Sequence, residues 1–383
     1  MGEYIKRRFG VLPRQRILEA FKSGLLASDS DPKQYVQPSS IDIPLAEHVT
    51  RLQAAFLPEN HIGSVAENIK RLQRDEFYLE TLKPRTLERE QTYLIALDLS
   101  AELLDEFTGP FNPKSTTGRA DCLTRVIVDG VRNYDTITPG EKRRCWIEIT
   151  PLSWDILVTK GLAVNQLRLH YGENPVDDVA LRMTYAKNPL LSDPEGRPIY
   201  IKQARFKKGG LELTVDLEAD IVGYKAKLDS SIAFNLSAGK GELLGQEKKF
   251  FEPIERPKNG SLILEKDAFY LLGTYEKVVI PDDLTGTLEA YDVTSAEGRA
   301  HYAGYLESGF HACVTLEMRV RDTPFMITHR QPICVLHYDH MLEVPCDAEG
   351  NVKVYEGSYQ SQPRGPNLPK QFGVRKIETG SLR

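Results

Sequence analysis

Two hydrophobic patterns divide the chain near residue 77. Between residues 13 and 25, apolar side chains recur every three or four positions after Pro13, which predicts a helix. Apolar residues separated by polar ones over 46–76 indicate a second helix. Beyond residue 77, short apolar runs alternate with turns rich in Gly, Pro, Asn and Asp, a texture typical of an all-β sandwich or barrel.

The segment 187–210 is rich in proline, glycine and charged residues, which makes it the best candidate for a domain boundary. A hairpin that connects two strands would have the same composition. Short strands resume after it, whereas the last residues show no apolar periodicity and predict an extended tail. We therefore expect a mainly β chain with a few helices, divided into a first unit over 1–200, a second over 201–350 and a tail over 351–383.

The second half of the chain repeats short motifs of the first half in the same order. The matched segments are Ser39-Ser-Ile41 with Ser230-Ser-Ile232, Tyr93-Leu94 with Tyr270-Leu271, Phe107-Thr-Gly109 with Leu284-Thr-Gly286, Ser115-x-x-Gly-Arg119 with Ser295-x-x-Gly-Arg299, and Glu148 with Glu317. The offsets drift by loop-sized amounts while the order holds, as expected of a duplicated domain.

Composition and charge limit the classes of function. Lys and Arg number 49 against 54 Asp and Glu, a net charge of −5, which argues against a general binder of nucleic acid or of membrane surfaces. No apolar run has the roughly 18 residues needed to cross a membrane, and the first residues do not resemble a secretory signal. The five cysteines are scattered and form no CxxC, which indicates reduced thiols. We expect a cytoplasmic protein.

Glu148 and Glu317 each lie in an apolar strand, where strict alternation places them opposite the most hydrophobic face. Such a carboxylate either faces solvent or lies in a semi-apolar pocket, where a raised pKa suits it to proton transfer. Ser and Arg of the repeated Ser-x-x-x-Arg segment could bind an oxyanion or a polarised carbonyl nearby.

Several other chemistries lack their motifs. The chain has no GxxxxGK[ST] phosphate loop, no GxGxxG between a strand and a helix, and no H-x-E with P-C-x-x-C of the zinc deaminases. His337 and His340 have metal-ligand spacing, but no third ligand cluster accompanies them, which favours a structural role. We therefore assign no metal ligand.

Four segments resemble one family, the dCTP deaminases. They are Gln37-Pro-Ser-Ser-Ile-Asp42 after a helix, AGYLESGF at 303–310, the strand and hairpin of 314–338, and Tyr359-Gln-Ser-Gln362 with Pro366 and Leu368 in the tail. The resemblance covers most of the chain, with two copies where usual members have one. The sequence looks like a long, tandem-duplicated form of that family within the dUTPase-like superfamily.

The resemblance implies two tandem dUTPase-like β-barrel domains of jelly-roll type and the hydrolysis of dCTP to dUTP and ammonia. In the family a glutamate holds the attacking water, no zinc takes part, and Mg²⁺ arrives with the triphosphate. In the family, sites form between the subunits of a trimer and the tail closes as a lid, so we expect a homo-oligomer with a trimeric or pseudo-trimeric arrangement.

Matching the motifs position by position gives the candidate site. The catalytic positions are Ser115, Arg119 and Glu148 in the first copy, and Ser295, Arg299 and Glu317 in the second. The candidate substrate-binding positions are Lys114, Ala303, Glu307, Tyr359, Gln362 and Arg364.

The two copies depart from the family pattern in different places. The first keeps Lys114 and Asp42 but has no good match to AGYLESGF, whereas the second keeps that motif and the tail but has Thr294 and Ala233 at the other two positions. A composite site that uses elements of both copies is therefore one hypothesis. Glu307 stands where dUTPases carry Asp, which keeps a dUTP or dCTP diphosphatase, or a bifunctional enzyme, as an alternative. A second alternative is a non-catalytic nucleotide-binding regulator.

Overall fold

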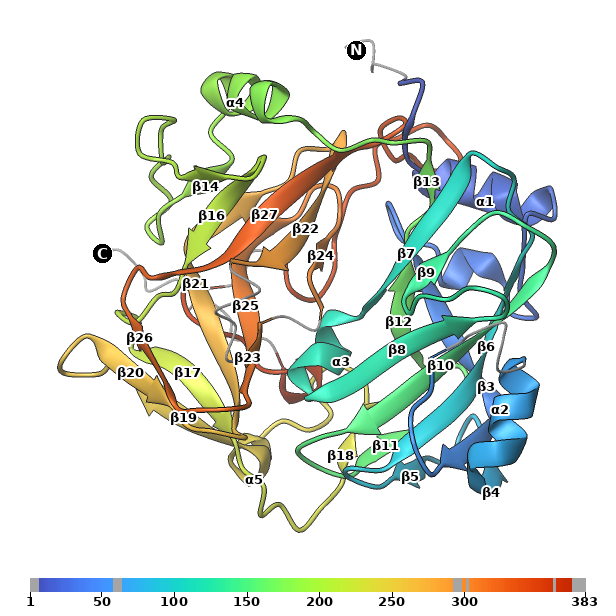
Figure 1. Cartoon of the computed structure of the whole chain (residues 1–383). Helices are drawn as coiled ribbons and strands as arrows, with labels where there is room; N and C mark the ends of the chain where they lie inside the picture. The colour runs from blue at the N-terminus through green and yellow to red at the C-terminus, as the bar shows by residue number, and fades with distance from the viewer. Residues whose placement is uncertain (1–6, 58–63, 292–297, 301–302, 361–362, 374–383) are drawn as a thin grey trace.

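Two β-rich bodies lie side by side, with the short helix α3 (Ser115–Arg119) between them (Figure 1). The computed structural model describes residues 7–57, 64–291, 298–300, 303–360 and 363–373, and for 298–300 it describes the backbone alone. The prediction of a mainly β chain is confirmed. In the described residues the strand orders are open paths, so hydrogen bonding does not close either body into a complete barrel.

The predicted first helix is confirmed as α1 (Arg14–Lys22), but a helix over 46–76 is wrong. Residues 46–52 complete a twelve-residue strand, β3 (Ile41–Leu52), because Val49 and its neighbours pair with the next strand of the sheet. Within the described part of 46–76 only α2 (Val65–Leu72) is helical, and it begins at a capping box formed by Ser64 and Glu67. Elsewhere the described residues form the helices α4 (Asp178–Lys187) and α5 (Glu247–Phe250) and the 3₁₀ turns η1 (Pro32–Gln34) and η2 (Lys370–Phe372).

The first body contains a sheet in the order β1-β13-β7-β12-β3-β6-β10-β8, to which β2, β4 and β9 are added at β6, β3 and β7. A small sheet, β18-β11-β5, covers one end. Besides β3 the strands are β1 (Gly10–Val11), β2 (Leu26–Ala27), β4 (Gln73–Tyr78), β5 (Arg85–Leu87), β6 (Thr92–Ala101), β7 (Phe107–Pro113), β8 (Cys122–Val128), β9 (Thr136–Ile137), β10 (Arg143–Pro151), β11 (Ile156–Val158), β12 (Ala163–Leu167), β13 (His170–Tyr171) and β18 (Phe234–Asn235).

The second body packs the sheet β19-β17-β21-β25-β23, with β14 added at β21, against the sheet β15-β16-β27-β22-β24. A separate hairpin pairs β20 with β26. The strands are β14 (Leu191–Ser192), β15 (Phe206–Lys207), β16 (Gly210–Thr214), β17 (Ile221–Ala226), β19 (Phe251–Glu255), β20 (Ser261–Leu264), β21 (Phe269–Val279), β22 (Leu284–Ala290), β23 (Gly298–Ala300), β24 (Tyr305–Leu306), β25 (His311–Val320), β26 (Phe325–Thr328) and β27 (Pro332–His340).

Strand register supports the predicted duplication. Glu148 on β10 lies opposite Leu94, and Glu317 on β25 lies opposite Leu271, the residue that the sequence matches to Leu94. A side-chain contact is repeated as well. The hydroxyl of Tyr93 accepts a hydrogen bond from a backbone N–H at 3.0 Å, and its counterpart Tyr270 accepts the equivalent bond at 2.9 Å. The two glutamates therefore occupy equivalent places in two copies of one fold.

One of the sequence matches is wrong. The register of the outer strands places Glu212, on β16, at the position of Asp42, so residues 209–211 correspond to 39–41. Ser230-Ser-Ile232 instead precedes β18, which pairs with the first body, and Ala233 is not the counterpart of Asp42. A three-residue match is too short to fix the alignment where strand β3 of one copy is split into two strands, β16 and β17, in the other.

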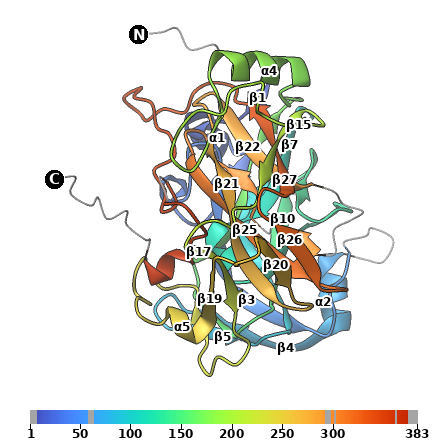
Figure 2. The ribbon, with the colours of Figure 1, turned by 90° about the vertical axis from the view of Figure 1, so that its left-hand side faces the viewer.

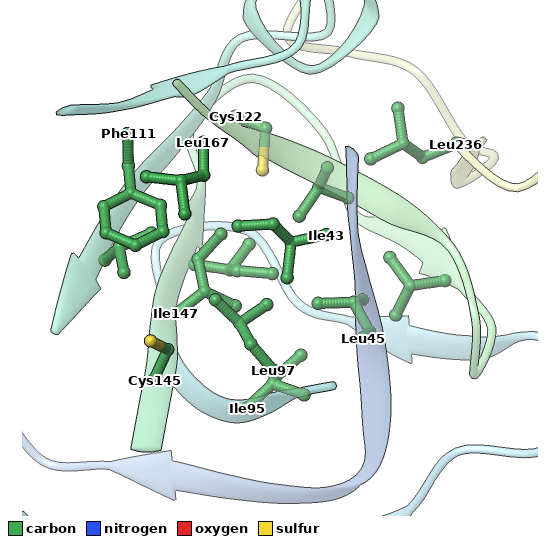
Figure 3. Close-up of a cluster of buried hydrophobic side chains, with 14 of the residues drawn as sticks. Ile43, Leu45, Ile95, Leu97, Phe111, Cys122, Cys145, Ile147, Leu167 and Leu236 are labelled. Atoms are coloured by element: carbon green, nitrogen blue, oxygen red, sulfur yellow. The ribbon is translucent and has the colours of Figure 1, made fainter. Parts of the chain in front are cut away.

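The two hydrophobic cores do not follow the predicted boundary at residue 200. Figure 3 shows the first core, in which Ile43, Ile95 and Ile147 pack together and Leu236 from the second half of the chain closes one side. The second core begins at Val176, so α4 and β14, which the sequence boundary at residue 200 places in the first unit, pack in the second body. No helix in the described part of the chain is long and apolar enough to cross a membrane.

The segment after β27 connects the two bodies a second time. It passes α1, where Arg16 forms an ion pair with Glu343 at 2.7 Å, and then follows the second body, where the N–H of Tyr355 donates to the carbonyl of Ser308. Figure 2 shows its last turn, η2, beside α5. There Phe372 packs in the first core, 5.8 Å from Phe250 between ring centroids.

Candidate active site

A cavity of about 280 Å³ lies where the two bodies and the tail meet. Its wall brings together three kinds of segment: α3 and the start of β3 from the first copy, β24 and β25 from the second, and the tail. The lining residues are Gln37, Asp42, Lys114, Ser115, Thr116, Arg119, Gln166, Ala303, Tyr305, Leu306, Glu307, Phe310, Cys313, Val314, Thr315, Glu317, Tyr355, Gly357, Ser358, Tyr359 and Lys370.

Glu317 is 1% exposed and reaches across the boundary from β25 to α3. A backbone N–H, that of Ala303, donates to its Oε2 at 2.9 Å. The carboxylate packs directly against Gly118, where a side-chain carbon would overlap it. The glycine of Ser-x-x-Gly-Arg in the first copy therefore makes room for the glutamate of the second.

Arg119 ends α3 and is 5% exposed. Its guanidinium lies 3.7 Å from the centre of the Tyr359 ring and donates to the carbonyl of Asn367 at 3.1 Å. Its Nε makes no hydrogen bond to any described residue. A buried cation that is held by a ring and a carbonyl, with one donor unused, suits an anionic or carbonyl-bearing ligand.

The tail closes one side of the cavity through Tyr359. Its hydroxyl lies 3.1 Å from Oγ1 of Thr116 and accepts a hydrogen bond from the backbone N–H of Lys370 at 3.0 Å. The backbone N–H of Asn367 donates to the hydroxyl of Thr315 at 3.1 Å, two residues before Glu317. The tail is thus fastened to both copies beside the candidate catalytic group.

One end of the cavity carries the ion pair of Lys114 and Asp42. The amide of Gln37 also donates to Asp42, at Oδ2 and 3.1 Å, while the buried Oδ1 has no hydrogen bond from a described residue. Lys370 of the tail lies near the same pair, and burial, together with the charge of Lys114, lowers the pKa of its ammonium. Two ammonium groups and one carboxylate therefore line this part of the cavity.

Glu307 lies at the wall between the copies. It is buried, and its carboxylate accepts hydrogen bonds from the backbone N–H of Ser39 at 2.8 Å and from the hydroxyls of Ser39 and Ser40. Burial raises the pKa of Glu307, although these hydrogen bonds act in the opposite direction. The hydroxyl of Tyr305 lies 2.5 Å from the hydroxyl of Ser39 and extends this hydrogen-bond network. Glu307 therefore joins the AGYLESGF motif of one copy to the Pro-Ser-Ser motif of the other.

Glu148 lies outside this cavity. It is buried on β10 and forms an ion pair with Arg125. Burial raises the pKa of Glu148, opposed by Arg125 and by the backbone of Phe56. Apolar residues of α2 and the loop before it cover the same face of the sheet, and Tyr134 donates to the carbonyl of Phe56 at 2.5 Å. The second glutamate of the sequence prediction is thus enclosed by this copy's own α2.

The structure places the other predicted residues as follows. Lys114, Ser115, Arg119, Ala303, Glu307, Glu317 and Tyr359 line the cavity. Arg364 does not line it and instead contacts the fully buried Asp216 at 2.6 Å, with Glu195 and Glu218 nearby. Ser295 and Gln362 lie outside the described residues, and Arg299 is described only as backbone on β23, opposite Arg319.

Sequence reasoning missed several lining residues. Gln37 belongs to the motif that was recognised and could have been added from it, as could Tyr305 within AGYLESGF. Lys370 and Tyr355 belong to no motif, and only the path of the tail brings them to the cavity. A cavity lined by both copies agrees with the hypothesis of a composite site. That hypothesis arose because each copy lacks family motifs that the other copy keeps.

Two family models match adjoining parts of the chain. Residues 8–173 match the N-terminal domain of 2′-deoxycytidine 5′-triphosphate deaminase, and residues 177–372, half of the chain, match its C-terminal domain. The chain belongs to the dCTP deaminase family. The two matches meet between residues 173 and 177, close to the point where the second core begins.

Individual relatives agree with this assignment. A crystal structure of 2′-deoxycytidine 5′-triphosphate deaminase from Agrobacterium tumefaciens superposes with a TM-score of 0.79 at 28% identity, covering 89% of this chain and all of that one. The "dCTP deaminase, dUMP-forming" of Streptomyces griseus is 30% identical over 125 residues, and that of Methanothermobacter thermautotrophicus is 26% identical over 124. These matches span 31% of this chain and 63% and 62% of the respective relatives.

Proposed function

We propose that this protein hydrolyses dCTP to dUTP and ammonia at the composite cavity, with Glu317 as the group that activates water. The observation that carries the proposal is the position of Glu317, which reaches from the second copy to Gly118 of the first, in a partly open cavity that Lys114, Arg119 and Lys370 also line. The A. tumefaciens structure and the curated relatives are named as dCTP deaminases, which supports dCTP as the substrate of this chain.

The chemistry follows from the position of this carboxylate. Glu317 takes a proton from water as the water oxygen attacks C4 of cytosine, and the proton then passes to the departing amino group. The bond from C4 to the amino nitrogen breaks, ammonia leaves, and C4 becomes the carbonyl carbon of uracil. Proton transfer by a positioned side chain contributes about 10²–10⁴-fold to such a rate. In this proposal Arg119 and Ser115, which line the same cavity, hold the base and the water.

The polyphosphate lies toward Lys114 in this proposal, and Mg²⁺ accompanies it. The described residues hold no cluster of three His, Cys, Asp or Glu side chains that could bind an ion by themselves. Asp42, with a buried oxygen that accepts no hydrogen bond from a described residue, fits a metal held mainly by phosphate oxygens. Bound there, Mg²⁺ would neutralise phosphate charge, whereas Asp42 would fix the orientation of Lys114 through their ion pair.

A second candidate is the conversion of dCTP to dUMP. It is favoured by the names of the curated relatives, which are dUMP-forming, and by the buried oxygen of Asp42 next to Lys114. Glu307 is the weaker choice for positioning a water, because Ser39 and Ser40 already donate to its carboxylate. A non-catalytic nucleotide-binding regulator would need the same cavity but would form no product.

We also propose that one chain builds one complete site. The α3 segment, Glu317 and the tail, which the resemblance implies come from neighbouring subunits in the family, come here from the two copies of a single chain. A homo-oligomer of trimeric or pseudo-trimeric arrangement stays a prediction, as does a cytoplasmic location.

Product analysis separates the candidates. The full chain is incubated with dCTP and Mg²⁺, and ammonia, dUTP, dUMP and pyrophosphate are measured. Ammonia with an equal amount of dUTP supports deamination alone. Ammonia with dUMP and pyrophosphate supports the dUMP-forming reaction, and tight binding of dCTP without any product contradicts both.

A further inference from the structure

The cavity contains a lysine that no sequence motif predicts. Lys370 is the first residue of η2 and is fixed through its backbone, whose N–H donates to Tyr359 and whose carbonyl accepts from Gly241, both at 3.0 Å. The next residues anchor the turn, because Gln371 donates to the carbonyl of Leu236 at 2.9 Å and Phe372 packs in the first core. The ammonium therefore extends from a rigid part of the tail.

The charges around Lys370 do not balance. Lys114, Lys370 and the carboxylate of Asp42 line the same cavity, and Asp42 forms its ion pair with Lys114. No carboxylate among the described residues forms an ion pair with Lys370. Two ammonium groups sharing one carboxylate in a half-buried wall repel each other, and an anion placed between them would relieve that repulsion.

We propose that Lys370 binds the polyphosphate of the substrate together with Lys114, so that the substrate itself joins the tail to α3. The proposal rests on the proposed function for the identity of the substrate. It has a structural consequence, since the same residue holds Tyr359 through its backbone, and Tyr359 in turn stacks on Arg119. Binding of phosphate at Lys370 therefore stabilises the ring that covers Arg119.

The test compares Lys370→Gln with Lys370→Arg, which keeps the charge, and with Lys353→Gln, an exposed lysine of the same tail that lies outside the cavity. For dCTP we expect the KM of Lys370→Gln to rise about 10-fold or more while kcat changes little, and the arginine variant to retain most of the affinity. Deoxycytidine, which lacks phosphate, should be bound equally by all the proteins. An unchanged KM for dCTP, or an equal loss with deoxycytidine, would overturn the proposal.

A binding measurement keeps this test independent of catalysis. Inorganic tripolyphosphate should raise the Tm of the wild-type protein and of Lys353→Gln, and raise that of Lys370→Gln much less. If the wild type forms no product from dCTP but this difference is found, the proposed function fails and the phosphate site stands. An equal rise in all three proteins would contradict the site, whatever the enzyme catalyses.

Discussion

Gly118 of the first copy lies directly against the carboxylate of Glu317 in the second. The contact joins two segments that are 199 positions apart in the sequence, one in the Ser-x-x-Gly-Arg motif and one in the candidate catalytic strand. Each motif also occurs in the other copy, yet only this combination lines the cavity in the part of the chain that the structure describes. The duplication therefore supplies the two halves of one site.

Replacing Gly118 should displace this carboxylate. In Gly118→Val the added carbons would occupy the space of Glu317, which is also held by the N–H of Ala303. Because a misplacement of about 1 Å can cost about 10²-fold in rate, we expect kcat for dCTP to fall by about that factor while nucleotide binding persists. Steady-state kinetics with a parallel Tm measurement checks this. A variant that folds and keeps wild-type kcat would show that the contact does not position Glu317.

Arg364 should stabilise the closed tail without binding substrate. It forms an ion pair with Asp216, whose side chain is fully buried, outside the cavity. In Arg364→Gln we expect faster proteolysis within the tail and a loss of about 3- to 10-fold in kcat/KM, because Tyr359 is then held less often over Arg119.

A double-mutant cycle identifies the partner of Arg364. If the ion pair is the cause, Asp216→Asn combined with Arg364→Gln should cost little more than either single change. A loss in dCTP affinity from Arg364→Gln alone, with unchanged proteolysis and additive effects, would instead favour the direct substrate contact predicted from the sequence motif.

The fold should lose stability in acid through His170. Burial and the nearby Arg168 guanidinium lower the pKa of this imidazole to about 4, and its Nδ1 lies 3.1 Å from the side-chain oxygen of Asn174. An unfolded chain binds the proton near pH 6.5, so the folded state is favoured above that value and loses this advantage as the pH falls toward 4. We therefore expect the decrease in Tm over this range to be smaller by a few degrees in His170→Gln.

The exposed His311 provides the control for this measurement. His311→Gln should follow the wild-type Tm at each pH, because its side chain is exposed to solvent. Parallel curves for the wild type and His170→Gln between pH 6.5 and 4 would show that His170 does not contribute to acid unfolding.

The duplication and seven of the cavity-lining residues could be predicted from the sequence, because a strand motif also determines how its residues pair with the neighbouring strand. Glu317, Arg119 and the tail tyrosine were found from short motifs, and the register of β10 and β25 confirms that the two glutamates are equivalent. The alternation of apolar residues could not show which glutamate lines the cavity, because the two strands have the same pattern. That choice depends on α2, which encloses Glu148, a contact between distant segments.

The remaining errors have similar causes. Residues 46–52 were predicted to be helical since Val49 and Leu52 have helical spacing, yet pairing with β6 makes them a strand. The role of Arg364 depends on Asp216, and the position of Lys370 depends on an aromatic anchor that is formed by residues from three parts of the chain. None of these contacts leaves a local pattern in the sequence.

The most direct test of the composite site is the rate of ammonia release from dCTP by Glu317→Gln and Glu148→Gln, measured beside the wild type under saturating substrate. If Glu317 activates the water, its glutamine variant should lose about 10²–10⁴-fold in kcat, since the amide cannot accept the proton. Glu148 lies outside the cavity, and the amide oxygen of Glu148→Gln can still accept a hydrogen bond from Arg125. Its kcat should therefore stay within about threefold of the wild type. Wild-type turnover by Glu317→Gln, or an equal loss in both variants, would contradict a single site built from the two copies.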